Sequence, residues 1–179
     1  MPSCSTISLC IRSTRQGSES VLLEKDQLLG GMARRLHHTI EGADIQAYLK
    51  GLIDKVVDDP KIELLTDATI SGFEGFQGNF VTDVAVGGNG DTQSIAHGVI
   101  MVATGANEYQ PKEFLYGEND RVMTQVELSD HLEKGSLADP DTVVMIQCVG
   151  SRNEHTPYCS RLCCSMAIKN AIAVKEKTP

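Results

Sequence analysis

The stretch that decides the fold is Val99-Ile100-Met101-Val102-Ala103-Thr104-Gly105, an apolar run that ends at a Thr-Gly turn. Such a run is typical of a strand buried on both faces of a parallel sheet. Before it, residues 69–85 alternate apolar and polar side chains, and Gly87-Gly88-Asn89-Gly90-Asp91 is a strong turn signal. We therefore expect a small antiparallel β-meander, at about residues 69–97, followed by a buried strand.

Upstream of the meander, the sequence predicts a strand, a helix and a second strand. Val21-Leu22-Leu23 is a short apolar run closed by acidic Glu24, which indicates a buried parallel strand. Asp44 can cap a helix that runs to about Val57, since apolar residues recur there at helical spacing. The second strand is Ile62–Leu65. Residues 1–16 show little helical periodicity, so no element is assigned to them.

Downstream, Thr124 opens a short helix to about Glu133, with Glu127 placed to complete a capping box. Residues 143–147 form another apolar run and predict a buried strand. A last helix is expected from Cys159 or Ser160 to about Lys175. This order of elements indicates an α/β fold with a mostly parallel sheet, and the inserted meander is unusual for a plain flavodoxin-like sheet.

Composition narrows the class of protein. The chain has 179 residues, enough for one domain or one and a part, and its core must be aliphatic because only 4% of residues are aromatic. A net charge of −8 argues against nucleic acid as a partner. No apolar run reaches the roughly 18 residues that a membrane span needs. The N-terminus has no apolar segment of secretory type, so we expect a cytoplasmic protein whose cysteines are thiols or metal ligands.

Four of the six cysteines, Cys148, Cys159, Cys163 and Cys164, fall within 17 positions. Iron–sulfur ligation needs four thiolates that converge on one point. Cys159 and Cys163 are four residues apart and would share a helix face, and Cys148 would end the preceding strand. Cys164 would point about 100° away from Cys163 on a regular helix.

This spacing favours an iron–sulfur cluster over three alternatives. Structural zinc usually shows two closely spaced pairs of ligands. Core cysteines without metal are common, because free cysteine is often buried. A redox dithiol is the third alternative, although adjacent Cys163 and Cys164 would make a strained disulfide. Arg152 and Arg161 flank the set and could offset the charge of a negative cluster.

Glu24 lies at the carboxyl end of a predicted strand, where ligands of doubly wound sheets bind. A carboxylate there can accept hydrogen bonds from both hydroxyls of a ribose, and a solvated acid is an equally good interpretation from position alone. The pairs Gly30-Gly31 and Thr104-Gly105 are each weak signals, since most glycines simply make turns.

Taken together, Glu24, Gly30-Gly31, the meander and Ala103-Thr104-Gly105 resemble the flavoproteins with two dinucleotide-binding domains. More narrowly, the sequence is similar to the A subunit of heterodisulfide reductase and its bacterial relatives. The stretches that carry this resemblance lie within residues 19–179: Val21–Lys25, Asn79-Phe80, Tyr116-Gly117, Val122–Gln125, Ile146–Arg152 and Pro157–Cys164.

The resemblance implies a Rossmann-like, three-layer FAD/NAD(P)-binding domain with a β-meander over residues 1–120. An incomplete second dinucleotide-binding domain, residues 121–179, would carry the cysteines. The implied function is electron transfer between FAD and a [4Fe–4S] cluster, within a heterodisulfide-reductase-like complex of several subunits. A homodimer is left open.

The resemblance also implies roles for single residues. Cys148, Cys159, Cys163 and Cys164 would ligate the cluster. Glu24 would hold the adenosine ribose, Gly30 and Gly31 would pass close to the cofactor, Ile70 would lie by the adenine, and Thr104-Gly105 would line the flavin phosphate side.

The chain departs from this pattern at its start. A Gly-rich phosphate loop is expected about 20 residues before Glu24, yet Met1–Thr6 contains no glycine. Two other functions therefore stay open: a non-catalytic remnant or scaffold fragment of such a flavoprotein, and a structural zinc module.

Overall fold

The computed structural model describes residues 4–88, 91–138 and 140–177. The predicted turn at Gly87–Asp91 lies partly outside these ranges. The first three residues of Met1–Thr6, the segment that contains no glycine, also lie outside them. The chain divides into two compact units. The first comprises Met1–Arg34 and Gln46–Ala106, and the second comprises Arg35–Ile45 and Asn107–Pro179. The predicted domain boundary near residue 121 stays a prediction.

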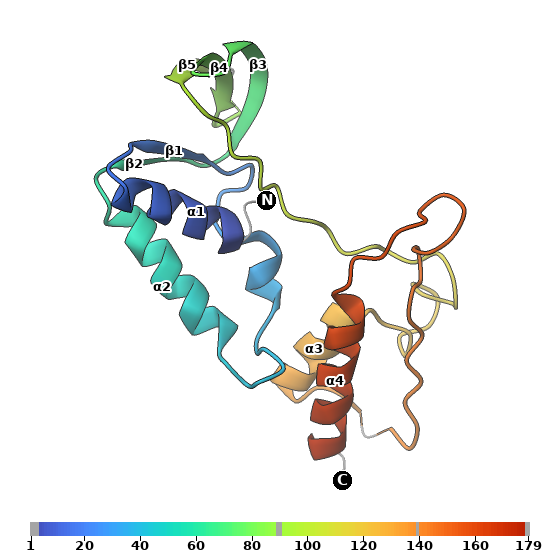
Figure 1. Ribbon diagram of the computed structural model, residues 1–179. Coiled ribbons are helices and arrows are strands. Elements are labelled where there is room, and N and C mark those ends of the chain that lie inside the picture. Colours follow the sequence, from blue (N-terminus) through green and yellow to red (C-terminus); the bar gives the residue numbers. More distant parts are fainter. Residues whose placement is uncertain (1–3, 89–90, 139, 178–179) are drawn as a thin grey trace. The chain divides into compact units, whose positions relative to one another are not determined.

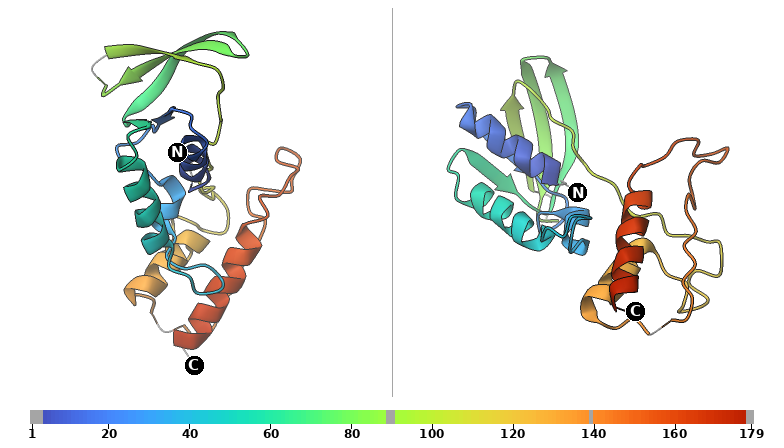
Figure 2. Two further views of the ribbon diagram at one scale, coloured as in Figure 1. Left: turned by 60° about the vertical axis from the view of Figure 1, so that its left-hand side comes forward. Right: turned by 60° about the horizontal axis from the view of Figure 1, so that its bottom comes forward.

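The first unit contains a parallel β-α-β arrangement (Figure 1; Figure 2). Strands β1 (Ser20–Leu23) and β2 (Ile62–Leu65) pair in parallel, and helix α2 (Ile45–Val57) connects them after the short 3-10 helix η1 (Gly31–Arg35). Both strands and the connecting helix lie where the sequence predicted them. The α/β class is therefore confirmed.

A helix at the start of the chain, α1 (Cys4–Arg15), was not expected. Ile7, Cys10 and Ile11 lie three and four residues apart and are all buried, because this side of the helix packs against α2 and the parallel strands. Serine and threonine lower the helix propensity of the segment, but burial of its apolar face stabilises the helix in spite of this low propensity. No element was predicted for residues 1–16, and that prediction was wrong.

One apolar cluster joins the helices and strands of this unit. Its buried members come from α1, α2, β1, β2 and the loop after β1: Ile7, Cys10, Ile11, Leu22, Leu29, Leu49, Leu52, Val56 and Ile62. The Thr14 hydroxyl of α1 also donates to Asp59 Oδ2, at 2.7 Å, beyond the end of α2. As predicted from the low aromatic content, this core is aliphatic.

The predicted meander is present. Strands β3 (Ala68–Phe76), β4 (Asn79–Val86) and β5 (Asp91–His97) form an antiparallel sheet in the order β3-β4-β5. The pairing runs from Ala68 opposite Val86 to Phe76 opposite Asn79, with an irregularity between Ile70 and Gly72. Alternation of side chains thus predicted the sheet correctly.

The two remaining predicted strands are not formed. Residues 99–103 and 143–147 have no regular structure, and Val99, Val102 and Val144 are 74%, 79% and 78% exposed. A strand requires a neighbouring backbone to hydrogen-bond with. Within the described residues, one sheet contains only β1 and β2 and the other only β3, β4 and β5, so neither apolar run pairs with a strand.

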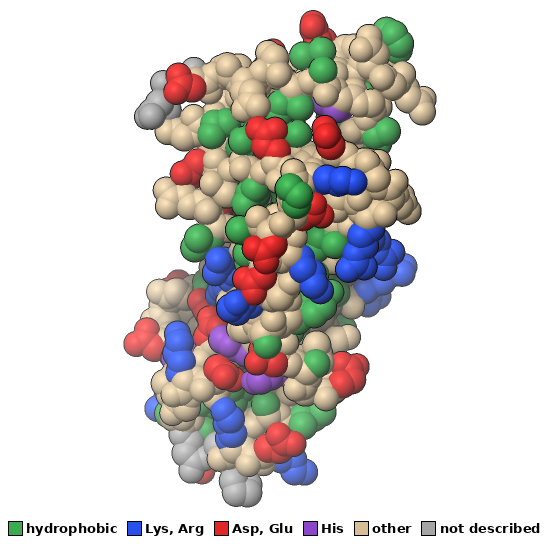
Figure 3. Space-filling view, turned by 90° about the vertical axis from the view of Figure 1, so that its left-hand side faces the viewer, with side chains coloured by type: hydrophobic (Ala, Val, Ile, Leu, Met, Phe, Trp, Pro, Cys, Tyr) green, Lys and Arg blue, Asp and Glu red, His purple; other side chains and the backbone are tan. Residues whose placement is uncertain are grey.

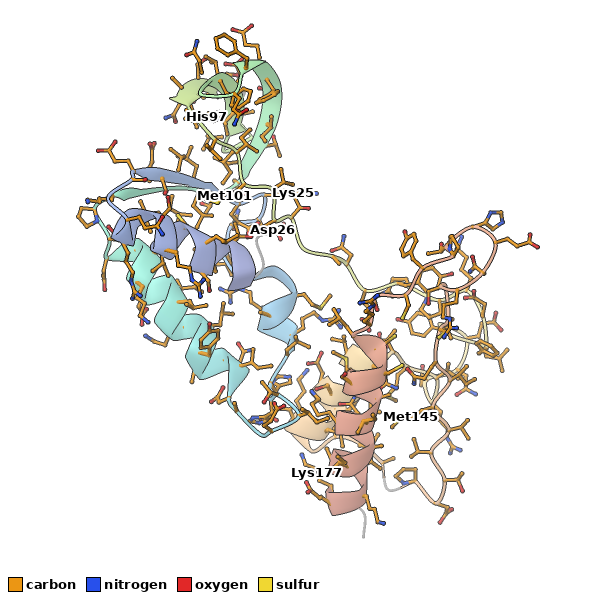
Figure 4. All side chains as sticks on the ribbon, in the orientation of Figure 1. Lys25, Asp26, His97, Met101, Met145 and Lys177 are labelled. Atoms are coloured by element: carbon orange, nitrogen blue, oxygen red, sulfur yellow. The ribbon has the colours of Figure 1, made fainter. Side chains whose placement is uncertain are left out.

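The second unit is built on helices α3 (Gln125–Lys134) and α4 (Cys163–Lys177). The predicted capping box is present: Glu127 N–H donates to Thr124 Oγ1, and Thr124 N–H donates to the Glu127 carboxylate. Leu128, Leu132 and Val174 form a small core, on which Met145 packs beside α4 (Figure 4).

Helix α4 begins at Cys163, later than the predicted start at Cys159 or Ser160. Arg161 has a left-handed backbone, with φ of 62°, which a helix cannot continue through. Among the described helices, none combines the length and the apolar character that crossing a membrane would require.

Candidate functional site

Glu24 follows β1 directly and is fully buried, with 0% of the residue exposed. Its Oε1 accepts a hydrogen bond from Asp26 N–H at 3.1 Å, whereas Oε2 is buried without a partner in the described part of the chain. Burial raises the pKa of this carboxyl group. The interpretation of Glu24 as a solvated acid is therefore wrong, and its unpartnered oxygen suits a hydroxyl donor such as a ribose.

Gly30 has a positive φ of 116°, and a Cβ at this position would lie 2.9 Å from Leu49 Cδ2 of α2. Its missing side chain thus lets the loop approach α2 closely. Gly31, with φ of 48°, opens η1. Both glycines have a clear use in the fold of the chain itself, so a contact with a cofactor stays a prediction.

Ile70 and Thr104-Gly105 are exposed. Ile70 lies on β3 of the meander with 59% of the residue accessible. Thr104 and Gly105 follow the irregular segment 99–103, and Gly105 has a left-handed backbone with φ of 71°. One hydrogen bond holds this segment to α1: the Thr6 hydroxyl donates to Ala103 O at 2.6 Å. All six residues predicted to bind FAD lie in the first unit.

The four clustered cysteines lie in the second unit and are free thiols. Cys148 and Cys163 are half-buried, while Cys159 and Cys164 are exposed. Loss of solvation raises the pKa of Cys164, and the thiolate charges of Cys163, Cys148 and Cys159 raise it further. The charges of the three other thiols, that of Cys148 included, thus act on Cys164.

Hydrogen bonds organise the loop that carries Cys159. Arg161 N–H donates to Cys159 Sγ at 3.3 Å, and Ser160 Oγ lies 3.7 Å from Cys163 Sγ. Because α4 begins at Cys163, Cys159 does not share a helix face with it, which corrects the predicted geometry. Cys163 lies on the same helix face as Ala167, Asn170 and Val174, whereas Cys164 is turned about 100° from it.

Four thiolates are a suitable donor set for an iron–sulfur cluster. Within the described ranges, however, no three His, Cys, Asp or Glu side chains already surround a point where a metal ion could bind. The donor chemistry fits the predicted cluster, and the ligand set stays a prediction.

The segment after η1 is held by acidic side chains. His37 Nε2 lies 2.8 Å from Asp130 Oδ1, and His38 Nε2 lies 3.4 Å from Glu133 Oε2. Figure 3 shows histidine side chains next to acidic ones on one face of the molecule. These pairs attach residues 35–45 to α3, so the histidines have a structural role.

Sequence reasoning missed Asn170, a fully buried polar residue of α4. Its Nδ2 donates to Gln125 O and Gln125 Oε1, both at 2.8 Å, while its Oδ1 is buried without a partner among the described residues. Asn170 lies seven residues after Cys163, on the same face as Ala167 and Val174. In the sequence, Asn170 is the polar residue among apolar ones at helical spacing, and this pattern could have marked it as a buried polar side chain.

Comparison with known proteins gives a partial match. A search of family models finds no match. The chain is 40% identical over 98 residues to the A subunit of the H(2):CoB-CoM heterodisulfide,ferredoxin reductase from Methanothermobacter thermautotrophicus, an alignment that covers 46% of this chain and 15% of that protein. It is 36% identical over 102 residues to the A subunit of the H(2)/formate:CoB-CoM heterodisulfide,ferredoxin reductase from Methanococcus maripaludis. This alignment covers 48% of this chain and 16% of that protein.

The iron–sulfur A subunit of CoB–CoM heterodisulfide reductase from Methanocaldococcus jannaschii is 36% identical over 98 residues. The resemblance to heterodisulfide reductase A subunits is confirmed for part of the chain. The alignments span only 15–16% of the length of these relatives. Among solved structures, L-proline dehydrogenase from P. horikoshii matches 51% of this chain and 18% of its own, with 16% identity and a TM-score of 0.44, a similarity too low to bear on function.

Proposed function

We propose that this chain is an oxidoreductase component that passes electrons between FAD and a [4Fe–4S] cluster, within a complex of the heterodisulfide reductase kind. The observation that carries the proposal is the 40% identity over 98 residues to a heterodisulfide reductase A subunit, and the four free thiols of the second unit, from two separate loops and the first turn of α4, supply the donors that a cluster needs. Thiolates gathered in this way repel one another, and a cluster of iron cations offsets that repulsion.

Cys148, Cys159, Cys163 and Cys164 would hold the cluster, which would supply one-electron redox chemistry. Arg161 N–H donates to Cys159 Sγ at 3.3 Å and would hold this sulfur in place as a ligand. Arg152 and Arg161 flank the set, and their positive charges would offset the negative charge of the cluster.

FAD would bind to the first unit, where the buried and unpartnered Glu24 Oε2 supports a contact with the adenosine ribose. The other predicted contacts are Gly30, Gly31, Ile70, Thr104 and Gly105. Met1–Thr6 contains no glycine, so this segment offers no Gly-rich loop to the phosphates of FAD. The partners would be further subunits, as the names of the relatives suggest.

Anaerobic purification tests the proposal through the content of iron, sulfide, FAD and zinc per chain. We expect about four iron and four sulfide ions, the content of one [4Fe–4S] cluster, together with FAD. Iron without FAD would favour the alternative of a remnant that has kept only its cluster. Zinc in place of iron would refute electron transfer and favour the structural zinc module.

Replacement of single cysteines tests the ligand set. Cys159→Ser should abolish the visible absorbance of the cluster and most of the bound iron. Cys10→Ala is the matched control, because Cys10 is buried in the core of the first unit and has a raised pKa from its burial. Equal iron content in the two variants would exclude Cys159 as a ligand.

A further inference from the structure

Cys148 opens a tight turn in the second unit. Its backbone is left-handed, with φ of 64°, and its carbonyl oxygen accepts a hydrogen bond from Ser151 N–H at 3.1 Å. Gly150, in the same turn, also has a positive φ, of 72°. A left-handed backbone is unfavourable for a residue other than glycine, so contacts from elsewhere in the chain must hold Cys148 in this conformation.

One such contact comes from Tyr109, which lies far from the turn in the sequence. A Cβ added at Gly150 would lie 2.5 Å from Tyr109 Cε1 and 2.8 Å from Tyr109 Cγ. One edge of the ring therefore occupies the space that a side chain at Gly150 would fill. Both residues belong to the second unit. Carbon atoms in contact lie about 3.5–4.0 Å apart, so only a glycine lets the ring approach the turn this closely.

Tyr109 is itself held by its neighbours in the sequence. Its hydroxyl group donates to the Glu113 carboxylate at 3.4 Å. The preceding residue, Glu108, accepts a hydrogen bond from Val126 N–H in the first turn of α3 at 3.3 Å, and its other oxygen lies 3.4 Å from Arg35 Nη1. Tyr109 is 48% exposed and lies outside both apolar clusters of the described residues. Its contact with the turn is therefore not part of a packed core.

We infer that Tyr109 is a positioning residue for Cys148: its ring, packed on Gly150, holds the turn that carries the Cys148 sulfur. The inference rests on the proposed function, in which Cys148 is a ligand of the cluster. Residues that orient a ligand without touching the metal strengthen metal binding, because a ligand already held in place loses less freedom when it binds. Through Glu108, Tyr109 also links this ligand to the N-terminus of α3.

Iron release measures this role in the chain that holds its cluster. Tyr109→Ala should speed the loss of iron to a chelator roughly tenfold or more, because nothing then packs on the turn at Gly150. Tyr109→Phe keeps the ring and should lose iron at nearly the normal rate. Tyr48→Ala is the matched control, because Tyr48 on α2 is similarly exposed, at 58%, and should have no effect. The electron paramagnetic resonance spectrum of the reduced cluster should change with Tyr109→Ala alone.

Alkylation of the cysteines measures the same role without a cluster. In cluster-free chain, Tyr109→Ala should speed the reaction of half-buried Cys148 with iodoacetamide several-fold and leave that of exposed Cys159 nearly unchanged. Gly150→Ala should act in the same direction, because its Cβ meets the ring. The two substitutions together should have less effect than the product of their single effects, since removal of the ring also removes the clash. Mass spectrometry of peptides follows each cysteine separately.

The outcomes separate this role from the proposed function. Normal iron release by Tyr109→Ala, with an unchanged alkylation rate of Cys148, would overturn the role and leave the proposed function intact. Faster alkylation of every cysteine, buried Cys10 included, would also overturn it, because the ring would then serve the stability of the whole chain. Equal effects of Tyr109→Ala and Tyr109→Phe would overturn the packing on Gly150 as the cause. An unaltered chain without iron would refute the proposed function, and with it a ligand for Tyr109 to position.

Discussion

The two units of the chain differ in how their apolar segments are used. In the first unit, nine buried residues from α1, α2, β1, β2 and one loop form a continuous core. In the second, the apolar cluster has three buried residues, and the apolar run 143–147 is largely exposed. Local folding in the first unit is thus stabilised by burial, whereas the second relies more on helix caps and polar contacts.

This difference bears on the two predicted sites. Glu24 is fixed in a packed environment, and one of its oxygens has no partner there among the described residues. The four cysteines lie where the backbone is irregular, with left-handed conformations at Cys148 and Arg161. A cluster can therefore contribute to folding of the second unit, because metal binding to a loosely held ligand set stabilises the bound conformation.

Removal of a core side chain should have the largest effect. Leu49 of α2 is 3% exposed and packs in the core of the first unit, so Leu49→Ala should reduce the free energy of unfolding by about 2–5 kcal/mol. Leu28→Ala is the control, because Leu28 in the same unit is 59% exposed and should change it by less than about 0.5 kcal/mol. Chemical denaturation followed by circular dichroism measures both, and equal losses would contradict the assigned core.

Replacing two glycines of the first unit by alanine should change the stability of the fold in opposite directions. Gly30→Ala places a Cβ 2.9 Å from Leu49 at a positive φ, and should cost about 1–3 kcal/mol of stability. Gly51→Ala lies inside α2 with nothing within 4 Å of the new Cβ, and should add about 0.5–1 kcal/mol. Thermal unfolding of FAD-free protein is the measurement. A neutral Gly30→Ala would show that this glycine is not required by the packing against α2.

Local patterns in the sequence predicted most of the regular structure. The alternation in residues 69–85, the helical spacing before Val57 and the Thr124–Glu127 capping box each depend on residues close together in the chain, and the elements that they predict are present. The strands at 99–103 and 143–147 failed because a strand depends on a distant backbone that the local pattern does not report. Helix α1 was not predicted for the opposite reason: the helix propensity of its residues is weak, and burial against distant parts of the chain stabilises it.

The site residues follow the same rule. The sequence could place Glu24 at the end of a strand, but whether it is solvated or buried depends on how the loops after β1 and β2 close over it. Spacing alone predicted a shared helix face for Cys159 and Cys163, and the left-handed Arg161 between them prevents it. The association of Cys148 with the other three cysteines was expected because a strand at 143–147 would end beside the last helix; that strand is not formed, so the association stays a prediction.

Removal of the N-terminal cap of α3, in the second unit, should have an intermediate effect on the free energy of unfolding. Thr124→Ala removes the acceptor of Glu127 N–H and should reduce stability by about 1 kcal/mol. Glu127→Gln should cost less, because an amide oxygen can still accept from Thr124 N–H. Denaturation of the two variants compares them directly. If Thr124→Ala had no effect, the cap would not contribute to the stability of this unit.

The smallest expected effect concerns the charge of Glu24 and appears as a dependence on pH. Burial raises the pKa of this carboxyl group in the folded chain above its ordinary value, so the folded state holds the proton more tightly than the unfolded state does. The carboxyl group therefore does not destabilise the fold below its unfolded pKa, and it opposes folding increasingly as pH rises through the folded pKa. Glu24→Gln, which cannot ionise, should be more stable than the unaltered chain at neutral pH.

At acidic pH, where Glu24 is protonated in both states, that advantage should vanish. Asp26→Asn is the control, since Asp26 lies two residues away, keeps its backbone N–H for Glu24 Oε1, and should not reproduce the pH dependence. Unfolding at a series of pH values with cofactor-free protein measures the difference. An advantage of Glu24→Gln that is the same at every pH would contradict a raised pKa of Glu24, and with it the burial of this carboxyl group in the folded chain.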